Sequence, residues 1–274
     1  MTTWVTRAFR IAYDGRAFHG FQRQPDVSTV EGELFAAFAA LGIDEPIAYA
    51  AAGRTDAGVS ALAQTIACSC PDWLTPAALT AALPPSIQAW AMADVPAQFH
   101  ARYDAQYRTY RYFLHRPDID AAAATTVATA VTGTHDFVNL CAESVDTTRA
   151  ITTTDVTIDG SWCIITITAP GFLRQQVRRI AALVDLVGTG QRSVDELECI
   201  IDGNGLPGGA AIPSAPPEPL VLLDVSYPDH IGPFVVDLGG RRGVFGAEAR
   251  HLETVAQVLN TIDDGIEART VIDE

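Results

Sequence analysis

The order of apolar and polar residues predicts both strands and helices in the first half of the chain. Short segments that alternate, or that are apolar throughout, are typical of strands. We expect strands at residues 4–13, 46–50, 62–70, 87–92 and 108–114. Two other segments repeat their apolar residues at helical spacing, and we expect helices at residues 28–42 and 75–83.

The first predicted helix has recognisable ends. Ser28 and Glu31 have the spacing of a capping box, and Gly42 is a typical residue to end a helix. One face of this helix predicts a buried stripe of Val30, Leu34, Phe38 and Leu41. The second helix has Thr75 as its predicted N-cap and Pro76 in its first position.

The second half repeats this mixture of elements. Its pattern predicts helices at residues 120–132, 172–188 and 193–201, and strands at residues 151–158, 161–168 and 220–227. Asp159 and Gly160 predict a tight turn between the first two of these strands. The longest of the three helices is expected to bury a stripe of Leu173, Val177, Ile180, Val184 and Val187.

The arrangement of these elements points to an α+β fold. Strands and helices mix in each half, but few strand–helix–strand units alternate, which favours a largely antiparallel sheet. We divide the chain into an N-terminal half (1–115), a C-terminal half (116–228) and an acidic C-terminal appendage (229–274). The sequence of the appendage suggests no role for it.

Charge is the most unusual property of the composition. The formal net charge is −15, and all 18 basic residues are arginines, so the chain contains no lysine. An acidic chain without lysine suggests adaptation to a salt-rich cytoplasm, where carboxylates keep the surface solvated and salt screens their repulsion. A GC-rich coding bias, which also favours arginine over lysine, is the alternative explanation.

This acidity argues against nucleic acid as a partner, because a surface that binds nucleic acid is ordinarily basic. In concentrated salt, however, counterion release contributes little to binding. An enzyme that acts on RNA there would depend on a few well-placed arginines, on stacked aromatic rings and on hydrogen bonds. The positions of the arginines are therefore more informative than their number.

Other classes of protein find little support in the sequence. No apolar run approaches the roughly 18–20 residues that a membrane helix needs, and the N-terminus lacks the order of a signal peptide. We therefore expect a cytoplasmic protein with no membrane partner. The five cysteines and six histidines are scattered, so we predict neither a disulfide framework nor a metal site.

The first candidate site is the stretch AAGRTDAGVSALAQ at residues 51–64. Gly53 and Gly58 allow sharp turns of the backbone, and Asp56 could be held at a strand end facing a cleft. An Asx turn is a simpler explanation for this aspartate. A surface ion pair between Arg54 and Asp56 is another.

The second candidate is FHARYDAQYRTYRYF at residues 99–113. On the predicted strand, Tyr110 and Tyr112 share one face, whereas we expect Arg108 and Arg111 elsewhere. Interleaved aromatic residues and arginines suit stacking on nucleic-acid bases. Tyrosines on the core face of a sheet would explain the pattern equally well.

The third candidate is the helix that follows Leu173. Arg174 and Arg178 are expected one turn apart beside the apolar stripe, so Arg178 could reach sideways into a cleft. Exposed arginines that only keep the helix soluble are the alternative. The sequence contains no Walker phosphate loop, no hydrolase nucleophile elbow and no phosphatase signature.

Taken together, these segments resemble the tRNA pseudouridine synthase A family. The matching stretches occur in the order of the family's motifs and cover roughly residues 7 to 228: YDGRAFHGFQRQP, GRTDAGVSALAQ, FHARYDAQYRTYRY, GTHDFVNL, TTRAI, GFLRQQVRRIAALVDLVG and EPLVLLDVSYP. The resemblance implies the pseudouridine synthase fold. In this fold, two related α+β halves form one continuous, mostly antiparallel mixed sheet that is flanked by helices and has a central cleft.

The resemblance also implies a reaction. Members of the family isomerise uridine in tRNA: the base is detached from the sugar, turned and rejoined through carbon. By resemblance, Asp56 acts at the anomeric centre of the sugar, either as a nucleophile or as a base for a neighbouring proton. Arg178 matches the arginine that would keep this carboxylate ionised. Tyr110 matches a tyrosine that could stack on the base and help to move the proton lost from its ring carbon.

Further residues are implied to bind the substrate. Arg54 matches the arginine thought to fill the place of the flipped-out nucleotide, so we expect Asp56 to pair with Arg178 and not with Arg54. Other candidates for contact with the substrate are Thr55, Arg111 and Arg174. An isomerisation needs no cofactor and no metal. The expected partner is tRNA, with uridines at positions 38 to 40 of the anticodon stem-loop as targets, and the expected assembly is a homodimer.

The sequence departs from the family pattern at a few places. Ser60 stands where many members have histidine, Phe21 where many have tryptophan, and Pro219 where glycine is usual. None of these replaces a residue expected to act in catalysis, but they leave the choice of nucleotide open. Two other functions also stay open: a non-catalytic RNA-binding relative, and a hydrolase of small molecules with an aspartate nucleophile.

Overall fold

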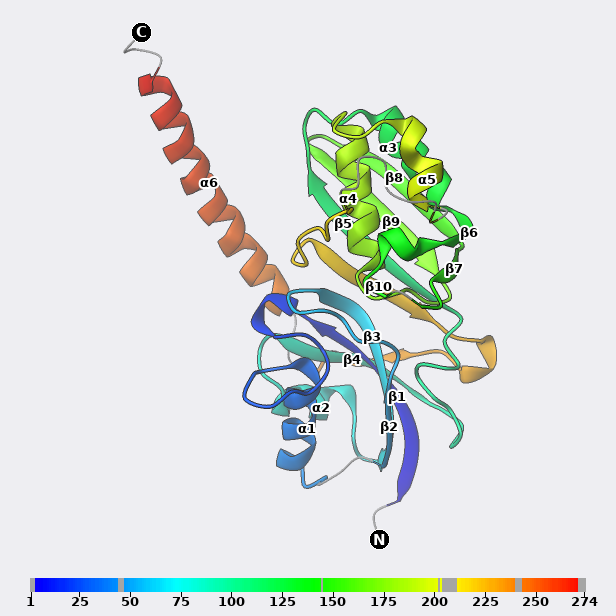
Figure 1. The fold of residues 1–274 in the computed structure, drawn as a ribbon. Helices are drawn as coiled ribbons and strands as arrows, with labels where there is room; N and C mark the ends of the chain where they lie inside the picture. Colours follow the sequence, from blue (N-terminus) through cyan, green and yellow to red (C-terminus); the bar gives the residue numbers. More distant parts are fainter. Residues whose placement is uncertain are drawn as a thin grey trace.

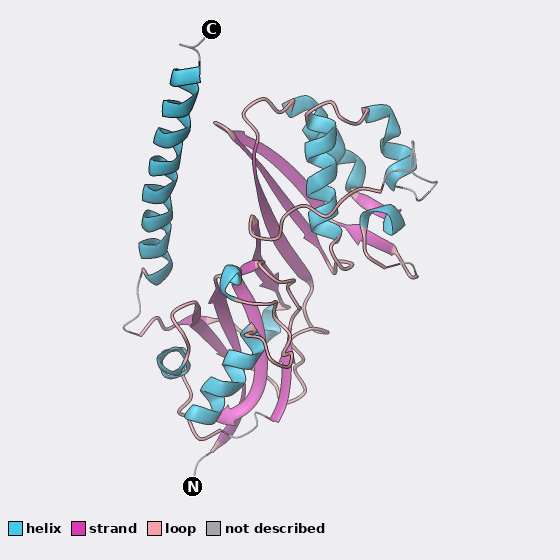
Figure 2. Cartoon of the chain, turned by 60° about the vertical axis from the view of Figure 1, so that its left-hand side comes forward, coloured by secondary structure: helices cyan, strands magenta, loops and turns pink. Residues whose placement is uncertain are grey.

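The computed structural model of the chain describes residues 3–43, 47–143, 145–201, 203, 211–239 and 243–270. Within this part of the chain, one nine-stranded sheet joins the two halves (Figures 1 and 2). Eight strands follow one another in space in the order β11 (Val235–Val236), β4 (Ile87–Asp94), β1 (Trp4–Tyr13), β3 (Ser60–Pro71), β10 (Leu220–Ser226), β5 (Tyr107–His115), β9 (Trp162–Ala169) and β8 (Thr153–Asp159).

The ninth strand, β2 (Ile47–Ala51), pairs with β3 outside this order. Of the strand pairs formed by the described residues, only β10 and β3 run parallel. The predicted α+β class, with a mostly antiparallel mixed sheet, is therefore confirmed. The five strands expected in the first half are all present, and the residues that lead into β2 lie outside the described part.

Helices α1 (Val30–Ala40) and α2 (Pro76–Ala82) cover the sheet of the N-terminal half. The capping box predicted for α1 is wrong, because the N-cap is Thr29, whose Oγ1 accepts a hydrogen bond from the Gly32 N–H at 3.2 Å. Ser28 instead donates its hydroxyl hydrogen to a carboxylate of the helix (3.0 Å). The cap predicted for α2 is correct, since Thr75 accepts from the Ala78 N–H at 3.1 Å.

The C-terminal half has its own helical layer over the sheet (Figure 1). Its main elements are α3 (Ala121–Val131), α4 (Gln176–Gly188), η3 (Val194–Glu196) and α5 (Leu197–Ile201). A small second sheet pairs β6 (Gly133–Asp136) with β7 (Thr148–Ile151), and η2 (Phe137–Leu140) lies between them in the chain. The predicted turn at Asp159 and Gly160 joins β8 to β9, but Ile151 belongs to β7 and not to that hairpin.

Each half packs its own apolar core. One cluster of buried residues is centred on β1, β3, α1 and α2, and a second on β5, β9, α3 and α4. Tyr110 on β5 contacts both clusters. Strand β10 lies between β3 and β5, and its Leu220 belongs to the C-terminal core while its Leu222 and Val225 belong to the N-terminal core. The two layers of helices are therefore held on one sheet, with a space between them.

Helix α4 begins later than its apolar pattern suggests. It starts at Gln176, not at residue 172, because Gln175 takes a left-handed conformation with φ of 62°. The Gln176 side chain accepts a hydrogen bond from the Leu173 N–H at 2.9 Å and so closes the turn before the helix. The predicted stripe is nevertheless buried at all of its positions, including Leu173.

The predicted appendage consists of two different parts. Residues 229–236 belong to the N-terminal half, since Ile231 is buried in its core and β11 pairs with β4. Helix α6 (Val244–Thr270) projects away from the rest of the chain (Figures 1 and 2), and its residues 247–262 are exposed. None of the helices that the structure describes is both long and apolar enough to cross a membrane.

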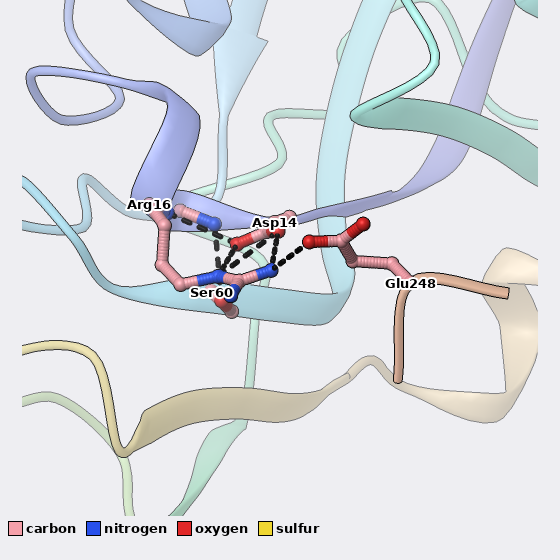
Figure 3. Close-up of polar contacts among 5 residues, drawn as sticks. Asp14, Arg16, Ser60 and Glu248 are labelled. Atoms are coloured by element: carbon pink, nitrogen blue, oxygen red, sulfur yellow. Dashed lines mark hydrogen bonds and ion pairs between the residues drawn. The ribbon is translucent and has the colours of Figure 1, made fainter. Parts of the chain in front are cut away.

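An exposed cluster of charges lies at the base of α6 (Figure 3). Arg16 in η1 (Gly15–Ala17) pairs with Asp14, and its Nη2 lies 3.3 Å from Glu248 Oε1 of α6. Ser60 accepts a hydrogen bond from the Gly15 N–H at 3.0 Å. This cluster ties the start of α6 to the end of β1.

Candidate active site

The loop between β2 and β3 holds Asp56 in a fixed backbone conformation. The Thr55 side chain is buried, and its hydroxyl lies 2.9 Å from the Tyr13 hydroxyl of β1. The Thr55 carbonyl accepts a hydrogen bond from the Phe21 N–H at 3.0 Å. Gly58 follows with φ of +84°, a conformation that a residue with a side chain rarely adopts. The loop is therefore anchored on both sides of Asp56.

An ion pair joins this loop to the C-terminal half. Arg178 Nη1 of α4 lies 2.9 Å from Asp56 Oδ2, and Arg178 Nε donates to the Ala215 carbonyl at 2.7 Å. The Arg178 side chain is 13% exposed and the Asp56 side chain 34% exposed. No described residue forms a hydrogen bond with Asp56 Oδ1. One carboxylate oxygen is thus held by Arg178, and Asp56 lines the cavity described below.

The prediction that Asp56 pairs with Arg178 and not with Arg54 is confirmed. Arg54 is exposed, lines the same cavity and forms no ion pair with Asp56 in the described part of the chain. The aspartate is paired across the cleft with Arg178 instead. The simpler interpretation of the loop, a turn closed by an ion pair between neighbouring residues, is therefore wrong.

Tyr110 lies in the middle of β5 and contacts the cores of both halves. Its ring meets Phe172 edge to face, with 5.3 Å between the ring centroids. Burial raises the pKa of Tyr110 to about 12; Arg108 opposes this shift and the negative charge of Asp56 adds to it. The hydroxyl therefore keeps its proton through the neutral range and could donate it to a substrate.

These side chains line one cavity of about 1320 Å³, whose lining comes from both halves of the chain. Its charged lining differs from the surface of the chain as a whole, because positive groups outnumber negative ones. The charged residues that line it are Arg54, Arg102, Arg108, Arg174, Arg178, Glu31, Asp56 and Glu143. In a chain of net charge −15, this cavity is a place where a polyanion meets little repulsion.

The other predicted site residues are placed differently. Arg174 lines the cavity, but it precedes α4 and so does not lie one helical turn from Arg178. Its N–H donates to the Glu143 carboxylate at 2.9 Å. Arg111 is not among the described residues that line the cavity, and its Nε donates to Thr166 of β9 at 3.1 Å. Thr55 lines the cavity while its hydroxyl contacts Tyr13.

The sequence reasoning missed Arg108. We expected it away from Tyr110, but residues two apart on a strand share a face, and Arg108 lines the same cavity. Its guanidinium donates to the carbonyls of Ala52 at 2.9 Å, Arg102 at 2.6 Å and Pro170 at 2.6 Å. The alternation along β5 was the signal that could have placed it.

No group of three or more metal-ligating side chains is gathered at one place within the described part of the chain. The groups that face the cavity are instead a carboxylate, guanidinium groups and a protonated phenol. These can attack or deprotonate a sugar carbon, bind phosphates and stack on a base.

Comparison with known proteins agrees with this set of groups. A family model described as tRNA pseudouridine synthase matches residues 127–228. A protein named tRNA pseudouridine synthase A from Haloarcula marismortui is 43% identical over 275 residues, which cover 95% of this chain and 100% of the relative. Proteins of the same name from Halobacterium salinarum and Natronomonas pharaonis are 50% and 47% identical over 228 residues, or 81% of this chain and 84% and 85% of those relatives.

Two details of these matches bear on the sequence predictions. The Haloarcula match spans so much of the chain that it includes part of the segment after residue 228. These three relatives come from halophilic archaea, in keeping with an acidic chain that lacks lysine. The chain belongs to the tRNA pseudouridine synthase A family.

Proposed function

We propose that the chain isomerises uridine to pseudouridine in tRNA, and that Asp56 acts at the anomeric centre of the target nucleotide. The observation that carries this proposal is the ion pair between Asp56 and Arg178, which spans the cleft beside Tyr110. The pair fixes a carboxylate in the cavity without a flexible tether, as chemistry at a sugar carbon requires. Membership of the family supports the same reaction.

The reaction is balanced without any added reactant. The bond between C1′ of the ribose and N1 of the base breaks, and a bond between C1′ and C5 of the same base forms. C5 loses a proton and N1 gains one. Asp56 either attacks C1′ or removes the proton from C2′, and the free Oδ1 suits both roles. We propose that Tyr110, which stays protonated at neutral pH, stacks on the base and takes part in the proton transfer at C5.

Access to the base requires that the nucleotide leaves its helix. Arg54 is exposed at the cavity and is not engaged by Asp56, so we propose that it fills the space that the flipped nucleotide leaves. We propose that Arg174, which also lines the cavity, binds a phosphate of the substrate. The proposed targets are uridines at positions 38 to 40 of the anticodon stem-loop.

We also infer the setting of the reaction from the family. The chain is proposed to act in the cytoplasm as a homodimer on whole tRNA, and its two halves (1–115 and 116–228) to be related units that share the site. The two separate cores support this division. The tasks that we propose for Arg54, Arg174 and Arg178 require no cofactor.

Release of tritium from tRNA labelled at C5 of uridine tests the proposal. In concentrated salt, wild-type protein is expected to release tritium, and Asp56→Ala protein is expected to release none. If folded wild-type protein releases no tritium from any of several tRNAs but still binds them, a non-catalytic RNA-binding protein replaces the proposed enzyme. Equal release by both proteins would remove Asp56 from its role.

A further inference from the structure

One aromatic ring at the cavity has no part in the proposed reaction. Tyr103 lines the cavity and is 76% exposed, more than any other phenylalanine, tyrosine or tryptophan in the described part of the chain. A tyrosine ring offers a large rigid surface that loses little entropy when a ligand covers it. Its position at a functional cavity suggests that a ligand does cover it.

The Tyr103 ring packs against the ring of His100. Its centroid lies 4.2 Å from that of the His100 ring, with 32° between the planes. The Asp104 carboxylate accepts a hydrogen bond from the His100 N–H at 2.8 Å, and the Asp104 N–H donates to the His100 carbonyl at 3.0 Å. His100 Nδ1 accepts from the Arg102 N–H at 3.1 Å. An imidazole in a closed turn therefore packs against the tyrosine ring, which is still 76% exposed.

Positive charge lies next to the ring. The guanidinium carbon of Arg102 is 6.0 Å from the centroid of Tyr103. Arg108 binds the carbonyl of Arg102 at 2.6 Å and that of Ala52 at 2.9 Å. Ala52 directly precedes the loop that carries Asp56, so Arg108 joins the turn of Tyr103 to that loop. A group bound on Tyr103 is thus positioned relative to the proposed catalytic carboxylate.

We propose that Tyr103, together with His100 and Arg102, forms a stacking subsite for an unpaired base of the RNA substrate, beside the nucleotide that is isomerised. This inference rests on the proposed function and names a second contact of the same substrate. Tyrosine, histidine and arginine are the side chains on which unpaired RNA bases stack.

Because the chain is acidic, stacking is expected to supply a large share of its affinity for RNA. Contacts to phosphate lose affinity steeply as salt rises, because they release counterions, whereas stacking on a ring does not depend on that release. A chain with 33 acidic and 18 basic residues has few positively charged side chains that could bind phosphates. Stacking on Tyr103 therefore supplies affinity that survives in concentrated salt.

A thermodynamic cycle between one side chain and one base tests the subsite. Full-length tRNA is assembled by ligation, with a single abasic nucleotide at each position of the anticodon loop in turn. Dissociation constants in molar KCl are measured for Asp56→Asn protein and for Asp56→Asn/Tyr103→Ala protein, so that turnover does not interfere. Loss of one stacked base costs a factor of roughly 5 to 150, and we expect Tyr103→Ala to weaken binding about tenfold.

The cycle should then identify one base. One abasic position is expected to weaken binding to Asp56→Asn protein by a similar factor, and to cause no further loss with the double variant. Tyr103→Phe is expected to bind within about twofold of the parent, because the ring and not the hydroxyl makes the stack. Tyr107→Ala, which removes an exposed tyrosine outside the cavity lining, is the matched control and should bind as the parent does.

Two results would overturn the subsite. One is that every abasic position costs the two proteins the same factor, and the other is that Tyr103→Phe loses as much affinity as Tyr103→Ala. Unfolding is monitored in each variant, and the high exposure of Tyr103 predicts unchanged melting temperatures. Failure of the proposed function gives a different result, since wild-type protein would then release no tritium whatever the binding cycle shows.

Discussion

Two arginines in this chain each join segments that are far apart in sequence, and they do so in different surroundings. Arg178 binds Asp56 across the cleft at 2.9 Å, with side chains that are 13% and 34% exposed. Arg16 binds Glu248 at the base of α6 at 3.3 Å, with side chains that are 38% and 52% exposed (Figure 3). The first pair lies between two cores, and the second lies on the surface.

The difference in burial determines what each pair can do. An exposed ion pair contributes about 0–1 kcal/mol and is screened by salt. A partly buried pair is screened much less, and removal of one partner leaves a charge that water cannot fully solvate. In an acidic chain, the more buried pair can therefore fix a geometry in concentrated salt that the exposed pair cannot.

Of the changes to these two ion pairs, replacement of Arg178 should have the largest effect on activity and stability. Arg178→Lys removes the group that binds both Asp56 and the Ala215 carbonyl, because a single ammonium cannot span the two acceptors. We expect the single-turnover rate of tritium release to fall by a factor on the order of 100, and stability to fall by about 1–3 kcal/mol. Denaturant unfolding measures the second quantity.

The matched control for this variant is Arg179→Lys. Arg179 neighbours Arg178 on α4 but donates to the Ile212 carbonyl and does not touch Asp56. It should lose some stability and keep its rate of turnover. Equal rates for wild-type and Arg178→Lys protein would show that the buried pair is structural only.

Alkaline pH should destabilise the folded chain before it affects the exposed pair. Burial raises the pKa of Tyr110, Tyr112 and Tyr227 to about 12 each, above the ordinary value of 10.0. Their folded-state pKa is the higher one, so the stability they contribute is complete below pH 10 and is lost as pH rises from 10 toward 12. Each unit of difference in pKa is worth about 1.4 kcal/mol.

Stability measured by denaturant unfolding between pH 8 and 11 tests this prediction. A decline that begins near pH 10 is expected, together with a part of the tyrosine absorbance, that of the buried rings, which titrates only on unfolding. Constant stability to pH 11 would mean that these tyrosines are not buried in solution.

Arg54→Ala should separate function from stability. Arg54 is exposed and binds neither Asp56 nor another carboxylate in the described part of the chain, so its removal should leave the melting temperature almost unchanged. If it occupies the space of the flipped nucleotide, turnover should fall by about tenfold. A large loss of stability with unchanged turnover would contradict the role that we propose.

The smallest effect is expected at the base of α6. Glu248→Gln removes the partner of Arg16 while Asp14 still binds that arginine. Stability should change by less than about 1 kcal/mol, and by less still in molar salt. Tritium release should be unchanged, and a marked loss of activity would place α6 in the function of the site.

Much of the fold could be predicted from the sequence, because its strands and helices bury regular apolar patterns. The errors arose where two neighbouring residues could do the same task. Ser28 and Thr29 are both able to cap a helix, and only the turn of the backbone decides that Thr29 does so. The start of α4 depends on the left-handed Gln175, which no periodicity reveals.

The candidate site was predictable in part. The resemblance brought Asp56, Tyr110 and Arg178 together, and the structure places them at one cavity. The sequence alone does not give the carbonyl groups that Arg108 binds or the position of Arg111 outside the cavity. Both depend on how the strands pair and on the face of the sheet from which each side chain projects. Tyr103 belongs to the stretch at residues 99–113 whose interleaved aromatic residues and arginines suit stacking, but the exposure of its side chain is a property of the folded chain that this pattern does not give.

The central claim is that the Asp56 carboxylate, held by Arg178, performs the chemistry. Asp56→Asn tests it most directly, because an amide oxygen can still accept the hydrogen bond from Arg178 while the negative charge is lost. Pseudouridine is quantified by nucleoside mass spectrometry after incubation of tRNA with each protein in molar KCl. The account predicts that wild-type protein forms pseudouridine and that folded Asp56→Asn protein does so at least about a thousandfold more slowly. Comparable rates for the two proteins would contradict it.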